Sequence, residues 1–184
     1  ALQQDTSFKD CKIVIYSGSH RTHQAILDHV RDRFQIDCEM VDFIKLKHSE
    51  TMHAVNYPSF TLFWQMIAFT RVSLEAVFAC PCDVFVDTLG VACAYAAVKI
   101  LFGCRIASYT HYPMISTDML NQIGSGAQFN NSEAIERSSL FKTVKRVYYH
   151  LLMFTYKICG RFADQVATNS SWTNAHIVEL WGNP

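Results

Sequence analysis

The chain has 184 residues, which is long enough for one domain with its own hydrophobic core. Half of the residues are apolar and 17% are charged, a composition that excludes an intrinsically disordered chain. Its 16 Lys and Arg residues balance 16 Asp and Glu residues, so no net positive charge would attract nucleic acid, and we expect no nucleic-acid partner.

The seven cysteines are odd in number and irregularly spaced, which favours reduced core residues of a protein that faces the cytosol over a disulfide framework. Cys80 and Cys82 flank a proline, but no second pair of ligands follows at zinc-finger spacing. His20 and His23 would be neighbours on a helix, again without an acidic residue at ligand spacing. We therefore expect no metal site.

The first part of the chain predicts a β-α-β unit. Residues 11–17 form a short apolar run that ends at Gly18, as in a buried parallel strand followed by a turn. Residues 20–34 carry apolar side chains at helical spacing, and residues 36–43 alternate as a second strand. Units of this kind are right-handed and contain parallel strands.

Residues 60–80 form an apolar stretch that is nearly long enough to cross a bilayer. Arg71 and Glu75 interrupt it, and each charge would cost roughly 3 kcal/mol at the centre of a membrane helix. We therefore expect no transmembrane span, and two interpretations stay open. The stretch is either a core helix packed on the sheet, or a helix whose apolar side chains enter a membrane surface. The membrane interpretation assigns the contact to Phe63, Trp64 and Ile67.

A second β-α-β unit follows. Residues 83–88 predict a strand that ends at Asp87, and residues 91–102 predict an alanine-rich helix that ends at Gly103. The next strand begins at residue 105, so the loops after both strands should share one sheet edge. Asp87 then either binds a ligand or caps the following helix, which is the commoner role of such a residue.

The segment 105–120 carries the strongest functional signal. Its strand is followed by polar groups suited to a ligand, and Pro113 favours a loop at this point. Three of these groups precede an apolar pair as a helix N-cap cluster would. A strand end, a polar loop and a helix start form the usual ligand crevice of an open α/β sheet, and the helix start suits phosphate. The polar groups are His111, Tyr112, Ser116, Thr117 and Asp118.

Residues 139–161 predict the longest helix, in which Val144, Leu151 and Leu152 belong to the apolar face. Basic residues in its first turns oppose the helix dipole and so do not stabilise the helix. They either keep the surface solvated or attract anionic lipid headgroups or a diphosphate. Residues 163–170 predict a last strand, with Ser171 capping a final helix. The basic residues are Lys142, Lys145 and Arg146.

The order of elements predicts an α/β fold: one Rossmann-like domain over residues 1–184, with a parallel sheet and helices on both faces. The glycine-rich dinucleotide fingerprint is absent from the sequence. The pattern therefore places a ligand at the strand ends without identifying it.

Three runs carry a resemblance to a known family: residues 83–90 (DVFVDTLG), 103–120 (GCRIASYTHYPMISTDML) and 168–173 (TNSSWT). Together they resemble the GDP-mannose-dependent alpha-1,2-mannosyltransferases of the endoplasmic reticulum, which add the fourth and fifth mannoses to a dolichol-linked oligosaccharide on the cytosolic face. The resemblance extends over residues 12–181. It implies protein N-glycosylation as the pathway and retention of anomeric configuration.

The resemblance also implies the amino-terminal, acceptor-side half of a GT-B glycosyltransferase. GDP-mannose would be the donor substrate, with no cofactor and no essential metal. The implied partners are the dolichol-linked oligosaccharide, the membrane surface and other mannosyltransferases of the pathway. We expect the chain to be a fragment, inactive alone, because the family's glycine-rich loop and the paired glutamates of its donor domain would lie outside residues 1–184.

The resemblance assigns roles to individual residues. His111 matches the histidine that such enzymes place beside the transferred sugar, although a structural histidine is the alternative. Tyr112 and the segment 116–118 would shape the acceptor side, and Asn169 and Ser170 would face the same cleft. Two other functions remain open: a non-enzymatic membrane-surface domain, as in an inactive relative, and a small soluble nucleotide-binding domain of flavodoxin type.

Overall fold

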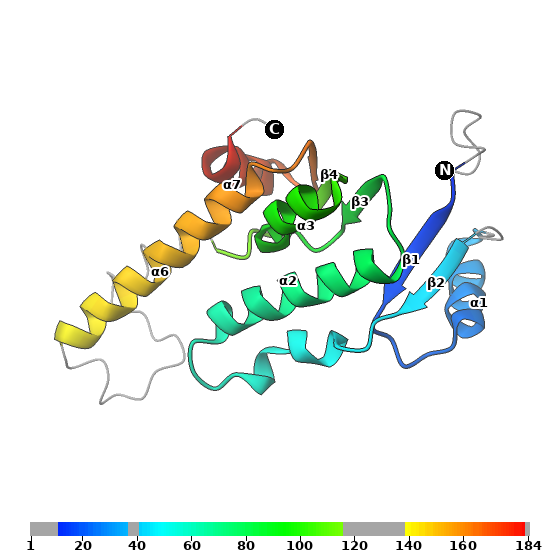
Figure 1. Ribbon diagram of the computed structural model, residues 1–184, viewed down its shortest axis with the longest axis horizontal. Coiled ribbons are helices and arrows are strands. Elements are labelled where there is room, and N and C mark those ends of the chain that lie inside the picture. The colour runs from blue at the N-terminus through cyan, green and yellow to red at the C-terminus, as the bar shows by residue number, and fades with distance from the viewer. Residues whose placement is uncertain (1–10, 37–40, 116–138, 183–184) are drawn as a thin grey trace. The chain divides into compact units, whose positions relative to one another are not determined.

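The computed structural model describes residues 11–36, 41–115 and 139–182, with the side chains of the long helix described from residue 143. The chain divides into two compact units, Ala1–Met52 and His53–Pro184 (Figure 1). The described strands form two separately hydrogen-bonded parallel sheets, one in each unit. The predicted α/β class with parallel strands and interleaved helices is confirmed.

The first unit contains strand β1 (Ile13–Ser17), helix α1 (His23–Phe34) and strand β2 (Val41–Lys45), followed by the 3-10 helix η3 (Ser49–Met52). The two strands pair in parallel, as the β-α-β prediction requires. Helix α1 ends at the left-handed residue Gln35, and Ile36, the first residue of the predicted second strand, is not part of a strand. Residues 37–40 of that prediction lie outside the described residues.

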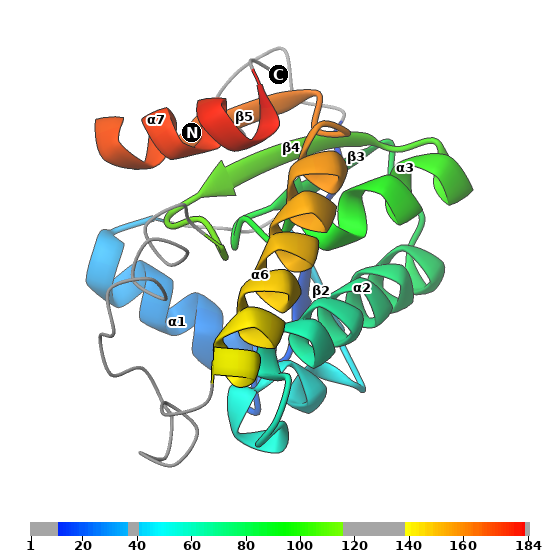
Figure 2. The same cartoon turned by 90° about the vertical axis from the view of Figure 1, so that its left-hand side faces the viewer.

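The second unit contains a three-stranded parallel sheet in the order β3-β4-β5, which is also the order of the strands along the chain. Figure 2 shows α6 and α3 on the same side of β4. The elements are η4 (Ala54–Asn56), α2 (Thr61–Ala79), β3 (Val84–Asp87), η5 (Ala92–Ala94), α3 (Tyr95–Phe102), β4 (Arg105–Thr110), α6 (Ser139–Gly160), β5 (Gln165–Thr168) and α7 (Ser171–Trp181).

One face of this sheet carries the hydrophobic core. Alternate residues of β4 are buried on it, and α2, α3, α6 and α7 all contribute side chains. At the centre, the Trp181 ring lies 5.9 Å from the Tyr95 ring and 5.4 Å from the Tyr156 ring. A Cβ at Gly160 would lie 2.3 Å from the Trp181 indole, so this glycine lets α6 and α7 approach closely.

The opposite face of the same sheet is exposed within the described part of this unit. Val84 and Val86 of β3 are 51% and 60% exposed, and Tyr109 of β4 is 39% exposed. The strands progress in one direction across the sheet, and right-handed crossovers then place their connecting helices on one face. The one-sided cover therefore follows from the topology.

The six described cysteines are free thiols. Burial and the neighbouring Cys104 raise the pKa of the Cys82 thiol to about 12, and burial raises that of Cys93 to about 12. Such thiols stay protonated and unreactive at neutral pH, which fits a structural role. Among the described residues, no group of three His, Cys, Asp or Glu side chains could hold a metal ion.

Candidate functional site

The carboxyl ends of β3, β4 and β5 lie side by side along one rim of the second unit's sheet. Parallel pairing sets Asp87 opposite Ser108 and Thr110 opposite Thr168. The loop after β3, the loop that begins at His111 and the turn before α7 therefore leave the sheet at neighbouring positions. The predicted shared edge of the Asp87 and His111 loops is confirmed.

The carboxylate of Asp87 organises the loop that leaves β3. Its Oδ1 accepts a hydrogen bond from the Leu89 N–H at 2.8 Å, and its Oδ2 accepts from the Val91 N–H at 2.8 Å. The Tyr95 hydroxyl also donates to Oδ2, at 2.6 Å. Both oxygens thus hold the loop after β3 and the Tyr95 hydroxyl. Neither η5 nor α3 has a side-chain hydrogen bond at its N-cap, so Asp87 is not the helix cap that the sequence offered as an alternative.

Buried hydroxyls continue from Asp87 along β4 towards the rim. The Tyr95 hydroxyl lies 2.8 Å from Ser108 Oγ, which lies 3.0 Å from Thr110 Oγ1. Burial and the Asp87 carboxylate raise the pKa of Tyr95 above its ordinary range, so the phenol remains a donor. The chain of hydroxyls holds the strand end in one geometry.

Gly90 allows the Asp87 loop to approach the end of β4. Its φ is +75°, and a Cβ there would lie 2.6 Å from Thr110 Cγ2. Its carbonyl oxygen accepts a hydrogen bond from the buried Tyr156 hydroxyl at 2.9 Å. The loop is therefore fixed from both the strand side and the α6 side.

His111 is exposed at the rim, immediately after the end of β4. Its ring contacts the Tyr109 ring edge-on, with centroids 4.7 Å apart and planes at 84°. Its main-chain oxygen accepts a hydrogen bond from the Thr173 hydroxyl at 3.1 Å. The imidazole thus lies outside the core, on a backbone that is held in place.

Thr173 on α7 joins the residues at the ends of β4 and β5. Its buried hydroxyl shares one proton between the His111 carbonyl oxygen and Asn169 Oδ1, which lies 3.0 Å away. Ser170 Oγ caps α7 by accepting from the Thr173 N–H at 3.1 Å and lies 2.9 Å from its hydroxyl. The cap is Ser170, one residue before the predicted Ser171.

Sequence reasoning assigned Asn169 and Ser170 to the cleft, and the structure places both at the rim as exposed residues. No role was assigned to Thr173 from the sequence, because its contact with the His111 loop joins residues 62 positions apart. Tyr112 lies at the rim and is 52% exposed. Ser116, Thr117 and Asp118, with their predicted helix cap, lie outside the described residues.

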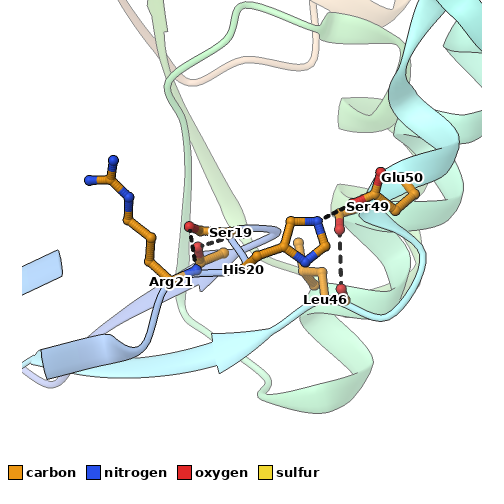
Figure 3. A network of polar contacts seen from close by, with 7 residues as sticks. Ser19, His20, Arg21, Leu46, Ser49 and Glu50 are labelled. Carbon is orange, nitrogen blue, oxygen red and sulfur yellow. Dashed lines mark hydrogen bonds and ion pairs between the residues drawn. The ribbon is translucent and has the colours of Figure 1, made fainter. Parts of the chain in front are cut away.

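The first unit has a polar network at the carboxyl end of its own strands, which the sequence did not predict as a site (Figure 3). His20 Nε2 and Glu50 Oε1 are 2.9 Å apart, and the Arg21 side chain extends away from them. A Cβ at Gly18 would lie 2.4 Å from Ser49 Cβ, so glycine is required there. A pocket of about 360 Å³ is lined by Gly18, His20, Lys45, Leu46, Lys47, Ser49 and Glu50.

The side of α2 that faces away from the core exposes the predicted membrane-contact residues. Phe63, Trp64 and Ile67 are 42%, 45% and 46% exposed, whereas Met66 and Val77 are buried. By length and composition, α2 is the one helix of the described chain that could cross a membrane. Because α2 contributes buried side chains to the core, the core-helix interpretation of residues 60–80 is confirmed for one side of the helix. The other side is exposed in the described chain, and its contact with a membrane surface stays a prediction.

Helix α6 differs from its prediction, because it has two apolar sides. Leu152 and Tyr156 face the core, whereas Val144 and Leu151, predicted on the same apolar face as Leu152, are exposed. Five apolar residues recur every three or four positions along the outer side and are 41% to 62% exposed. This outer stripe consists of Val144, Val147, Leu151, Phe154 and Ile158.

Comparisons with known proteins agree on one family. The family model described as ALG11 mannosyltransferase N-terminus matches residues 1–181. A mouse protein named GDP-Man:Man(3)GlcNAc(2)-PP-Dol alpha-1,2-mannosyltransferase is 37% identical, over 98% of this chain and 37% of its own length. Relatives of the same name from human and Caenorhabditis elegans are 36% and 35% identical, over 98% and 95% of this chain.

This chain spans little more than a third of those relatives, covering 37% of the human protein and 38% of the nematode protein. No solved structure matches the chain. The family match covers both units and the rim that carries His111. The chain therefore belongs to the ALG11 mannosyltransferase family and corresponds to the amino-terminal region of its members.

Proposed function

We propose that the whole protein transfers mannose from GDP-mannose to a dolichol-diphosphate-linked oligosaccharide in alpha-1,2 linkage, for protein N-glycosylation. Family membership and the names of the relatives support this reaction. The observation that carries it to particular residues is the exposed His111 on the shared rim of three parallel strands. Ligands of open α/β sheets bind at such a rim.

In this proposal His111 is the catalytic residue contributed by the chain. A neutral imidazole can hydrogen-bond a hydroxyl of the transferred sugar and stabilise charge that develops as GDP leaves. The acceptor hydroxyl forms a bond to the anomeric carbon while the bond from that carbon to the GDP oxygen breaks, and the hydroxyl proton passes to the departing diphosphate oxygen, with net retention of configuration. Held by Thr173, the His111 backbone would keep the ring in position without reorganisation.

The other rim residues shape the acceptor side in this proposal. Tyr112, Asn169 and Ser170 contact the acceptor, and Asp87 acts by holding its loop rather than by touching substrate. The segment 116–118 completes the acceptor side. No cofactor or metal is part of the proposal.

A lipid-linked acceptor requires the site to lie near a bilayer, which we propose to be the cytosolic face of the endoplasmic reticulum membrane. Apolar side chains exposed on α2 and the outer stripe of α6 support this assignment. Helix α6 contains four Lys or Arg residues and no Asp or Glu, and the described side chains include Lys145 and Arg146 in its first half and Lys157 in its last turn. Basic residues beside an apolar helical stripe favour an interface with anionic lipid. Other mannosyltransferases of the pathway are the remaining proposed partners.

The test uses the full-length protein with GDP-mannose and a lipid-linked acceptor. His111→Ala should reduce transfer by about 100-fold or more, the usual range for a lost proton-transfer or electrostatic group, without changing the melting temperature. His29→Ala, at an exposed histidine of α1, is the matched control and should transfer normally. Unchanged transfer by the His111 variant would refute the assignment.

A non-enzymatic membrane-surface domain is the second candidate, because the same exposed apolar stripes would serve it. The two functions differ in one measurement. Full-length protein that binds vesicles but transfers no mannose from GDP-mannose would favour the non-enzymatic function.

A further inference from the structure

Beside His111, the rim carries a surface cluster of aromatic rings, which joins Tyr112 to two residues that have no assigned role, Trp172 and His176. The Tyr112 ring stacks on the Trp172 ring, with centroids 5.1 Å apart and planes at 24°. Trp172 also contacts the His176 ring at 4.0 Å. Tyr112 belongs to the loop after β4, whereas Trp172 and His176 are one turn apart on α7.

These rings remain accessible to a ligand. Tyr112 is 52% exposed and Trp172 is 41% exposed, although large aromatic side chains usually bury most of their surface. The stack between two separate elements fixes both rings, so little side-chain entropy would be lost when a ligand binds. A preformed aromatic surface on a ligand-binding rim indicates recognition rather than packing.

Polar residues lie next to these aromatic residues on the same rim. Asn169 lies at the end of β5 and uses Oδ1 to accept from Thr173, which leaves its two amide protons without a partner in the described chain. His111 is the residue next to Tyr112 and is exposed. A pyranose presents C–H groups on its faces, which pack on aromatic rings, and hydroxyls at its edge, which pair with amide and imidazole groups.

We propose that Tyr112 and Trp172 form a stacking subsite for one pyranose ring of the acceptor oligosaccharide, with Asn169 bonding a hydroxyl of that ring. This inference rests on the proposed function. The subsite is the part of the acceptor side that provides affinity for the oligosaccharide. Because Tyr112 is adjacent to His111, the subsite binds a sugar next to the one that reacts. It contributes to acceptor binding rather than to the chemical step.

The first test measures steady-state kinetics of the full-length protein. Tyr112→Ala and Trp172→Ala should each raise the KM for the acceptor about tenfold, within the usual value of a lost aromatic contact, and leave the KM for GDP-mannose unchanged. Tyr112→Phe and Trp172→Phe keep a ring and should lose less, which also guards against misfolding. Val178→Ala, at another exposed position of α7, is the control and should behave as wild type.

The second test is independent of transfer and uses tryptophan fluorescence with a soluble mannose oligosaccharide. The chain has three tryptophans, and Trp181 is buried in the core, so a saturable change that Trp172→Phe abolishes would report the subsite. An unchanged acceptor KM in both alanine variants, or a rise in the KM for GDP-mannose instead, would overturn the inference and leave the proposed function standing. Saturable oligosaccharide binding in a protein without transfer activity would overturn the proposed function and retain the sugar subsite.

Discussion

The Thr173 hydroxyl donates a hydrogen bond to the main-chain oxygen of His111, although 62 positions separate the two residues. The Thr173 side chain is buried, and the bond joins the start of α7 to the loop after β4. An exposed histidine is thereby attached to the rigid part of the domain through its backbone. The position of the imidazole depends on this contact more than on its own side-chain packing.

Substitutions at Thr173 should distinguish the contribution of this hydrogen bond to stability from the contribution of side-chain packing. Thr173→Val keeps the shape but removes the hydroxyl from the His111 and Asn169 oxygens, so we expect a loss of about 1–3 kcal/mol in the free energy of unfolding. Thr173→Ser retains the hydroxyl and should recover most of it. Urea denaturation checks both values, and equal stability of the two variants would contradict the structural role.

Gly90 and Gly103 offer a matched pair of substitutions. Both have positive φ, +75° and +71°, so alanine at either position costs about 1–2 kcal/mol in backbone strain. Only at Gly90 does the new Cβ collide, 2.6 Å from Thr110 Cγ2, whereas nothing lies within 4 Å of Gly103. Overpacking should add about 1–3 kcal/mol to the loss for Gly90→Ala.

Thermal or urea unfolding of Gly90→Ala and Gly103→Ala measures this difference directly. The prediction fails if the two variants lose the same stability. A larger loss of stability in Gly90→Ala would also mean that the collision distorts the loop that carries Asp87. Mannosyl transfer by the full-length Gly90→Ala variant should then fall, while transfer by the Gly103→Ala variant stays near normal.

Much of this arrangement follows from local sequence patterns. Apolar runs located β1, β3 and β4, and the alanine-rich helix with its terminal glycine located α3. Parallel pairing then brought the loops after β3 and β4 to one edge, which is why the Asp87 and His111 neighbourhood was predictable.

Long-range contacts account for what the sequence did not predict. Thr173 and Trp172 reach the rim only because α7 packs beside the end of β4, and no spacing within residues 168–181 encodes that. The sequence predicts a single apolar face for α6, which combines the outer stripe with the core side. Leu151 and Leu152 are consecutive, but their side chains point in directions about 100° apart on a helix. The first unit's pocket depends on Gly18 meeting Ser49, another contact between distant residues.

Asp164 provides a pH-dependent prediction. The Lys99 ammonium donates to Asp164 Oδ1 at 2.6 Å and the Ile106 N–H donates to Oδ2 at 2.7 Å. These bonds lower the pKa of the carboxyl below its ordinary value. An unfolded aspartate has a pKa of about 3.9, so between that value and the lower folded pKa the unfolded chain binds more protons.

The stabilising effect of Asp164 should therefore be fully present above about pH 4 and be lost as the pH falls through the lowered folded pKa. Asp164→Asn removes this titration, and its stability should approach that of wild type at the acidic end. Urea unfolding at a series of pH values between neutral and acidic measures the convergence. A constant difference between the two proteins at every pH would contradict the assignment.

The outer stripe of α6 should bind a lipid surface. Leu151 and Phe154 are each 62% exposed, and burying such a side chain in an apolar phase yields about 1.5–3 kcal/mol. The double variant Leu151→Ser with Phe154→Ser should therefore reduce partitioning onto vesicles that contain anionic lipid by at least about tenfold. Flotation of the chain with such vesicles provides the measurement.

The control is the pair Ile100→Ser with Leu101→Ser on α3, whose side chains are 71% and 63% exposed. It removes as much exposed apolar surface from a helix that is not flanked by the basic residues of α6. Equal losses in the two double variants would mean that binding follows total apolar exposure rather than α6. A selective loss in the α6 variant, together with weaker binding at high salt, would indicate that the stripe and its basic neighbours act as one lipid-facing surface, because salt screens only the electrostatic part of the attraction.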